Sequence, residues 1–151
     1  MTQTRLLKSA QQVLERHEQR HALALAECER QVQENETKLA DLERYRAVYL
    51  RDFDQRAQEG VNGAQARTYQ TFINRVAHAV SEQQQLLARA RALHAEELRK
   101  WRAAARRTAA LNRIIQRRDR TASQHAERSE QAAADAHAQR LWAQKGARRG
   151  N

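Results

Sequence analysis

The sequence predicts an all-α fold in which two long helices, joined by one turn, pack as an antiparallel two-stranded coiled-coil hairpin. Residues 1–58 and 64–145 contain neither proline nor glycine, so turn-forming residues gather at positions 59–63. Charged residues make up 30% of the chain and aromatic residues only 5%, a composition typical of long helices rather than of a thick globular core. The predicted elements of this single domain (1–151) are a helix over about 3–58, a turn over 59–63, a helix over about 64–140 with a frayed end, and a flexible tail over 146–151.

Heptad spacing predicts which residues line the contact between the helices, here called the seam. On the first helix, one row contains Leu7, Leu14, His21, Cys28, Asn35, Leu42 and Tyr49, and the other contains Leu25, Val32, Leu39 and Phe53. On the second helix, one row contains Ile73, Val80, Leu87, His94, Trp101, Thr108 and Ile115, and the other contains Tyr69, Val76, Gln83, Ala90, Ala104 and Leu111. Folding the chain about Val61 aligns the rows, so that residues whose numbers sum to about 122 face each other.

Polar residues interrupt this predicted seam at Gln11, Glu18, Asn35, Arg46, Gln83, Glu97 and Arg118. Polar groups in a coiled-coil core lower stability and fix the register. Two interpretations stay open: long side chains reach out of a thin seam, or a weak hairpin becomes firmer on a partner. Residues 119–145 overshoot the first helix and have few apolar positions, so we expect an unpaired extension that carries the apolar pair Leu141 and Trp142.

Positive charge is concentrated in the second half of the chain. Residues 1–63 hold ten basic and eleven acidic side chains, whereas residues 64–151 hold eighteen and seven. Six arginines at helical spacing are expected on one stripe that faces away from the seam: Arg99, Arg102, Arg106, Arg113, Arg117 and Arg120. Such a stripe is either a solvated face or a binding site for an anionic partner, among which an acidic protein is preferred. Nucleic acid is not favoured, because no stacking aromatic residues interleave the stripe.

No catalytic site, cofactor or metal is expected. His17-Glu18-Gln19-Arg20-His21 matches the H-E-x-x-H pattern of zinc proteases, but a third ligand is missing from the facing segment near Trp101. We therefore interpret the match as chance. No apolar run approaches the ~18 residues that span a bilayer, and no secretion signal follows Met1. The lone Cys28 excludes an intramolecular disulfide but says little about the compartment, so the cytoplasm is expected by default.

The middle of the chain resembles a known family. Residues 42–49 read LERYRAVY, a glycine-containing turn follows, and residues 67–83 read RTYQTFINRVAHAVSEQ. Two tyrosines four residues apart, a turn with glycine, and a Tyr-x-x-Phe helix start followed by glutamine are similar to the flagellar type III export protein FliJ family. The stalk proteins of injectisome systems are a close alternative.

The resemblance implies a non-enzymatic stalk, similar to the central stalk of rotary ATP synthases. It implies that this stalk couples an export ATPase ring (FliI-like) to the membrane export gate protein (FlhA-like) and assists export chaperones, at the inner face of the cell membrane. It also implies gate-binding positions at Leu42, Tyr45, Tyr49, Phe72, Val76, Ala79 and Gln83. Tyr49 and Val76 also belong to the seam rows, where packing is their main expected role, so Tyr45 and Phe72 are the best candidates for direct contact.

The opposite end, from Met1 to about Val13 with residues 105–128, is expected to enter the ATPase ring through the arginine stripe. A basic nucleic-acid-binding coiled coil and a purely structural coiled coil that oligomerises remain the alternatives.

Overall fold

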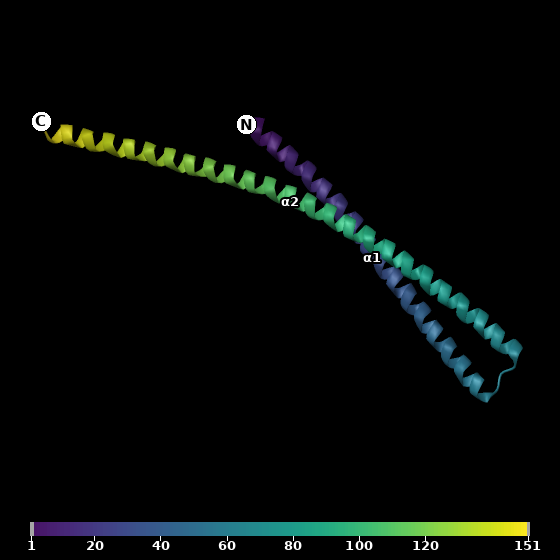
Figure 1. Ribbon diagram of the computed structural model, residues 1–151. Helices are drawn as coiled ribbons and strands as arrows, with labels where there is room; N and C mark the ends of the chain where they lie inside the picture. Colours follow the sequence, from purple (N-terminus) through teal and green to yellow (C-terminus); the bar gives the residue numbers. More distant parts are fainter. Residues whose placement is uncertain (1, 151) are drawn as a thin grey trace. The chain divides into compact units, whose positions relative to one another are not determined.

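The computed structural model describes residues 2–150, which form two α-helices and a short connection (Figure 1). Helix α1 spans Thr2–Glu59 and α2 spans Gly63–Arg149, and no strand occurs among these residues. The two helices pack against each other, which confirms the predicted all-α helical hairpin. Helix α2 continues past residue 140, where the sequence analysis placed its end, and through the expected tail at Gly146. Its alanine-, glutamine- and arginine-rich sequence favours helix, and one interior glycine costs only about 1 kcal/mol.

Contacts group the chain into two compact units. Unit 1 comprises Met1–Leu14 and Arg106–Asn151, and unit 2 comprises Glu15–Ala105. Each unit takes one segment from α1 and one from α2.

Unit 2 contains the connection between the helices. Gly60 ends α1 with a φ of +99°, a left-handed conformation that glycine adopts without steric cost, and its N–H donates to the carbonyl of Ala57. Asn62 then caps α2: its Oδ1 accepts from the N–H of Gln65 at 2.8 Å, while the Gln65 side chain accepts from the N–H of Asn62 at 3.4 Å. This reciprocal capping box satisfies backbone donors that the first turn of a helix leaves unpaired. The turn predicted at 59–63 is thus built from local backbone chemistry.

The seam follows the predicted heptad rows. Every buried residue among 2–150 lies on α2, and all seven belong to the two rows expected there: Val76, Val80, Gln83, Leu87, Ala90, Ala104 and Thr108. In unit 2, the predicted pair Phe53 and Tyr69 makes ring contact, with centroids 5.1 Å apart. In unit 1, the predicted pair Leu14 and Thr108 is joined by a hydrogen bond from the threonine hydroxyl to the leucine carbonyl. The antiparallel register is therefore confirmed within each unit.

Polar residues of the seam pair with each other across it. In unit 2, the buried amide of Gln83 donates to both the side-chain oxygen and the backbone carbonyl of Asn35, at 2.8 and 3.2 Å. In unit 1, Gln11 donates to Asn112 at 2.8 Å. At these positions the amide side chains in the seam satisfy each other.

Unit 1 also contains the C-terminal part of α2. Residues 119–149 are helical, and every one of them is exposed. Trp142 is the most exposed of the large apolar side chains, at 80%. The expected unpaired extension is therefore present as helix, and whether it frays stays a prediction.

Candidate functional site

All five tyrosine and phenylalanine residues of the chain gather in one cluster in unit 2, close to the turn. Tyr49 is its centre: its ring lies 5.7 Å from Tyr45, 5.9 Å from Tyr69 and 5.4 Å from Phe72, the last nearly parallel. Phe53 joins through Tyr69. Three of these rings come from α1 and two from α2, because heptad spacing on antiparallel helices brings both sets to the same height. We call these five residues the aromatic cluster.

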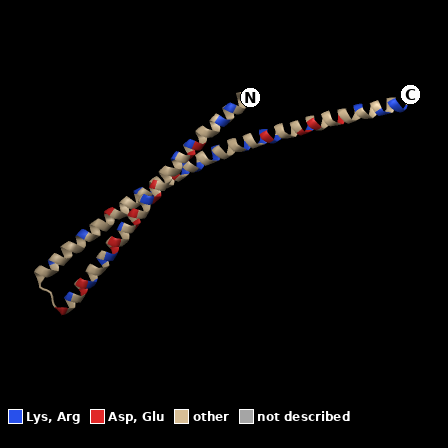
Figure 2. Ribbon diagram, turned by 180° about the vertical axis from the view of Figure 1, so that it is seen from behind, with Lys and Arg blue, Asp and Glu red and all other residues tan. Residues whose placement is uncertain are grey.

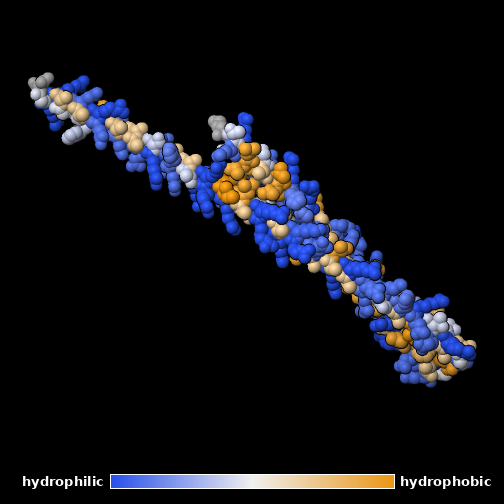
Figure 3. Space-filling view, turned by 45° about the horizontal axis from the view of Figure 1, so that its top comes forward, coloured by the Kyte–Doolittle hydropathy of each residue, from blue (hydrophilic) through white to orange (hydrophobic). Residues whose placement is uncertain are grey.

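Two rings of the aromatic cluster remain open to solvent. Tyr45 is 50% exposed and Phe72 is 40% exposed, although both lean on the half-buried Tyr49. Val48, one helical turn beyond Tyr45, adds exposed apolar surface at 56%. Figure 3 shows hydrophobic residues gathered near the turn. Rigid aromatic rings backed by a packed ring and left uncovered are typical of protein-binding hot spots.

The remaining gate-binding positions that the resemblance implies take different places. Leu42 and Ala79 are half-buried, whereas Val76 and Gln83 are buried in the seam. Gln83 bonds to Asn35 of the other helix, and the burial of Val76 indicates packing in the seam. Direct contact of either residue with a partner stays a prediction.

A polar network holds the turn side of the aromatic cluster. The hydroxyl of Tyr69 donates to the carboxylate of Asp52 at 3.1 Å, and Arg56 lies 3.7 Å from the same carboxylate oxygen. The Arg56 guanidinium also lies 5.9 Å from the centre of the Tyr69 ring, within the range of a cation–π contact. Partial desolvation, together with the hydrogen bond to Asp52, raises the pKa of Tyr69 above its ordinary value.

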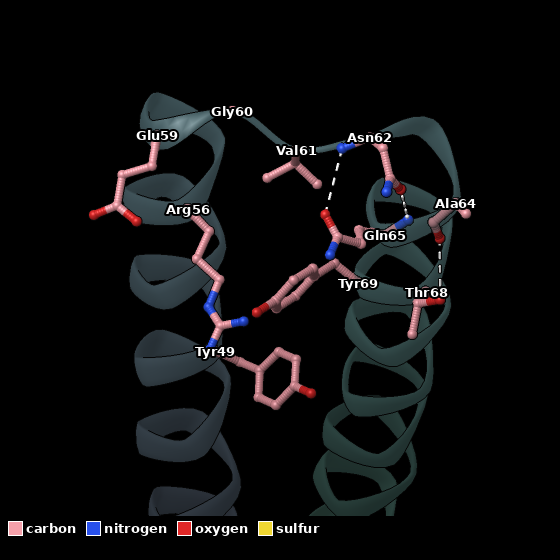
Figure 4. A pocket seen from close by; sticks show the side chains of 10 residues that line it. All are labelled: Tyr49, Arg56, Glu59, Gly60, Val61, Asn62, Ala64, Gln65, Thr68 and Tyr69. Atoms are coloured by element: carbon pink, nitrogen blue, oxygen red, sulfur yellow. Dashed lines mark hydrogen bonds between the residues drawn. The ribbon is translucent and has the colours of Figure 1, made fainter.

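A solvent-open cavity of about 620 Å³ lies between the helices at the turn, next to this network. Figure 4 shows Arg56, Tyr49 and Tyr69 projecting into the space beneath the Gly60–Asn62 connection. The cavity walls carry no cluster of catalytic groups: its charged side chains are Arg56 and Glu59. The cavity therefore presents one cation and one anion on an open surface beside the turn.

The six arginines of the predicted stripe are all exposed: Arg99, Arg102, Arg106, Arg113, Arg117 and Arg120. The first two belong to unit 2 and the other four to unit 1. Figure 2 shows the Lys and Arg residues distributed along this stretch of α2. In unit 1 the structure therefore presents a basic helical surface at Arg106–Arg120.

The H-E-x-x-H segment forms a hydrogen-bonded chain. His17 and His21 bring their Nε2 atoms to 3.3 Å, and Nδ1 of His21 lies 3.7 Å from Glu97 of α2. Among residues 2–150 no group of three His, Cys, Asp or Glu side chains is placed to hold a metal ion. Two seam atoms nearby, Nε2 of His94 and Oε2 of Glu97, are buried without a hydrogen bond. The segment thus contributes polar residues to the seam.

Sequence reasoning did not assign two parts of this site. Tyr69 and Phe53 were expected only as seam residues, yet they link the exposed rings to the Asp52–Arg56 pair. Leu86 and Leu93, exposed on α2, were not assigned a role. The heptad spacing of Leu86 and Leu93 from Phe72 and Ala79 could have shown that the four residues share one face of the helix.

The chain was compared with known proteins. A family model described as "Flagellar FliJ protein" matches residues 4–147, nearly the whole chain. No curated protein and no solved structure gave a match. Neither described helix has the combination of length and hydropathy that crossing a membrane requires.

Proposed function

Because the chain belongs to the flagellar FliJ protein family, we propose that it acts as a non-enzymatic stalk of the flagellar export apparatus. In this proposal the stalk couples the export ATPase ring to the membrane export gate protein and assists export chaperones. The observation that carries the proposal is the aromatic cluster, whose Tyr45 and Phe72 rings are exposed yet held in place by Tyr49. The gate protein is the proposed partner of this cluster.

The geometry of the aromatic cluster explains why it would bind tightly for its size. Tyr49 fixes the orientation of Tyr45 and Phe72 before binding, so little side-chain entropy is lost on docking. Aromatic side chains also supply large contact areas with few rotatable bonds. Val48 and Ala79 extend the apolar surface around the two rings.

The gate proposal is tested with the double change Tyr45→Ala, Phe72→Ala and binding to the purified gate protein. Hot-spot truncation typically costs at least ~2 kcal/mol, so affinity should fall about thirtyfold or more, and motility should be lost. Leu23→Ala is the matched control, since Leu23 is also a large exposed apolar residue of unit 2, at 63%. Wild-type gate affinity of the double variant, with helicity and melting unchanged, would refute the assignment.

The ring proposal concerns unit 1, where residues 2–13 of α1 pair with α2 and the basic surface at Arg106–Arg120 is exposed. The expected contact from Met1 lies outside the described residues. Changing Arg106, Arg113 and Arg117 to Glu should abolish stimulation of the ATPase while circular dichroism stays unchanged. The control changes Arg128, Arg140 and Arg148 to Glu, which alters net charge equally. Equal loss of stimulation in both variants would show that net charge, and not this surface, is what the ring requires.

A further inference from the structure

An apolar row runs along α2 beside the seam in unit 2, exposed at Phe72, Leu86 and Leu93 and half-buried at Ala79. Phe72, Ala79, Leu86 and Leu93 follow one another at intervals of seven residues, each directly before a residue of a seam row. Leu86 is 47% exposed and Leu93 is 53% exposed, similar to Phe72. Scattered exposed leucines are ordinary, but a heptad row is a continuous strip, roughly 30 Å long over 21 residues. We call these four residues the α2 stripe.

A column of charges flanks the α2 stripe on its outer side, and the signs alternate. Arg75, Glu82, Arg89 and Glu96 each lie three residues after a member of the stripe. Glu82 pairs with His78 at 3.1 Å, and Glu96 lies 3.7 Å from Lys100. Among residues 2–150, no carboxylate lies within ion-pair distance of Arg75 or Arg89. The column therefore offers two cations without an intramolecular anion.

The α2 stripe and its charge column are complementary to the same surface of a second, antiparallel copy of the chain. If a second copy of α2 lies antiparallel, with a two-fold axis at Leu86, residues whose numbers sum to 171 or 172 face each other. Leu86 then meets Leu86 of the second copy (86 and 86 give 172), and Ala79 meets Leu93 (79 and 93 give 172). In the same register Glu82 faces Arg89 (82 and 89 give 171), and Arg75 faces Glu96 (75 and 96 give 171). In a parallel two-fold alignment the two charge columns would lie on opposite sides of the stripe, so neither column would face the other.

We propose that this protein self-associates as an antiparallel, two-fold dimer through the α2 stripe, with a second copy of the chain as the occupant. Such an interface is isologous and closed, so association stops at the dimer. The apolar contacts are few and the ion pairs lie at the rim, so the dimer is weak and depends on protein concentration.

The dimer covers Phe72 and Ala79 and therefore competes with docking at the aromatic cluster. This consequence rests on the proposed gate function, whereas the self-association does not.

A charge swap tests the interface by sedimentation of the full-length chain over a wide range of concentrations. Glu82→Arg and Arg89→Glu each place like charges opposite one another twice per dimer, so the dissociation constant should rise about tenfold. The double variant Glu82→Arg, Arg89→Glu restores opposite charges and should return the dissociation constant to within about threefold of the original. Glu43→Arg, an exposed site on α1, is the control with the same charge change and should leave the dimer intact.

Cysteine cross-linking tests the position of the two-fold axis. In a Cys28→Ser background, Leu86→Cys places two thiols next to the axis and should form an intermolecular disulfide rapidly under mild oxidation. Leu50→Cys, at a similarly exposed leucine of α1, should not. A chain that stays monomeric at all concentrations, a charge swap that fails to recover, or equal cross-linking at both cysteines overturns the proposal. Loss of gate binding has no bearing on these measurements, so the two proposals can fail separately.

Discussion

Replacing Asn35 and Gln83 by leucine tests whether this polar pair serves the stability of the hairpin or the alignment of its two helices. Gln83 is buried, at 8% exposure, and donates two hydrogen bonds to Asn35. Asn35 is half-buried, and its own amide donates to the carbonyl of Gln31 at 2.8 Å. Gln83→Leu leaves Oδ1 of Asn35 without its partner, whereas Asn35→Leu removes two side-chain hydrogen bonds but keeps the one from Gln83 to the backbone carbonyl.

The magnitudes follow from burial and hydrogen bonding. Burying a leucine contributes about 2 kcal/mol at position 83 and about 1 kcal/mol at the half-buried position 35. Each lost hydrogen bond costs about 1 kcal/mol, and a buried group left without a partner costs a further 1–3 kcal/mol, roughly. Gln83→Leu and Asn35→Leu should each lower the free energy of unfolding by about 1 kcal/mol. The double variant should leave it unchanged to within about 1 kcal/mol, because the two leucines contribute about 3 kcal/mol and the three lost hydrogen bonds cost about the same.

The assay is urea unfolding of the four proteins, followed by circular dichroism and analysed as a double-mutant cycle. From these values the coupling energy is about 2 kcal/mol in favour of the matched pairs. We also expect the double variant to populate alternative registers, since a polar pair in a coiled-coil core specifies alignment at a cost in stability. Additive single changes, with a coupling energy below about 0.5 kcal/mol, would refute this account of the seam.

Three further predictions concern the turn. Gly60→Ala should lower the free energy of unfolding by about 1–2 kcal/mol because Gly60 has a φ of +99°. Gly63→Ala should instead raise the free energy of unfolding by up to about 1 kcal/mol, because the added Cβ would meet only the far end of the Arg67 side chain, at 3.9 Å. Equal effects in chemical denaturation would contradict this contrast. Asn62→Ala removes the side-chain half of the capping box and should cost about 1 kcal/mol, measured in the same way, whereas Asn62→Asp should retain most of it. In a chain whose only tyrosine is Tyr69, ultraviolet titration should show a pKa above the ordinary value, which Asp52→Asn should lower. Because the pKa of Tyr69 is higher in the folded than in the unfolded chain, the stability that its protonated hydroxyl contributes is complete below the unfolded pKa of about 10 and is lost as the pH rises through the folded pKa. An unchanged titration curve in Asp52→Asn would contradict the role of Asp52.

The sequence by itself determined the elements and their register. Helix is the only structure that long segments without glycine or proline sustain with local hydrogen bonds, so the break at 59–63 had to be the turn. The heptad rows identified every buried residue of α2 in advance, because on antiparallel helices the same angular position faces the partner at each turn. The end of α2 was misplaced, since local composition does not reveal how far an unpaired helix continues.

Only the tertiary structure decided which candidate residues are accessible. The resemblance implies gate binding at both Val76 and Phe72, yet Val76 is buried in the seam and Phe72 is exposed against Tyr49. The predicted register brings Tyr45 and Phe72 to similar heights along the helices. It did not predict that both rings contact Tyr49, or that Tyr69 bonds to Asp52. These features depend on side-chain directions across two helices, and periodicity along one helix does not contain that information.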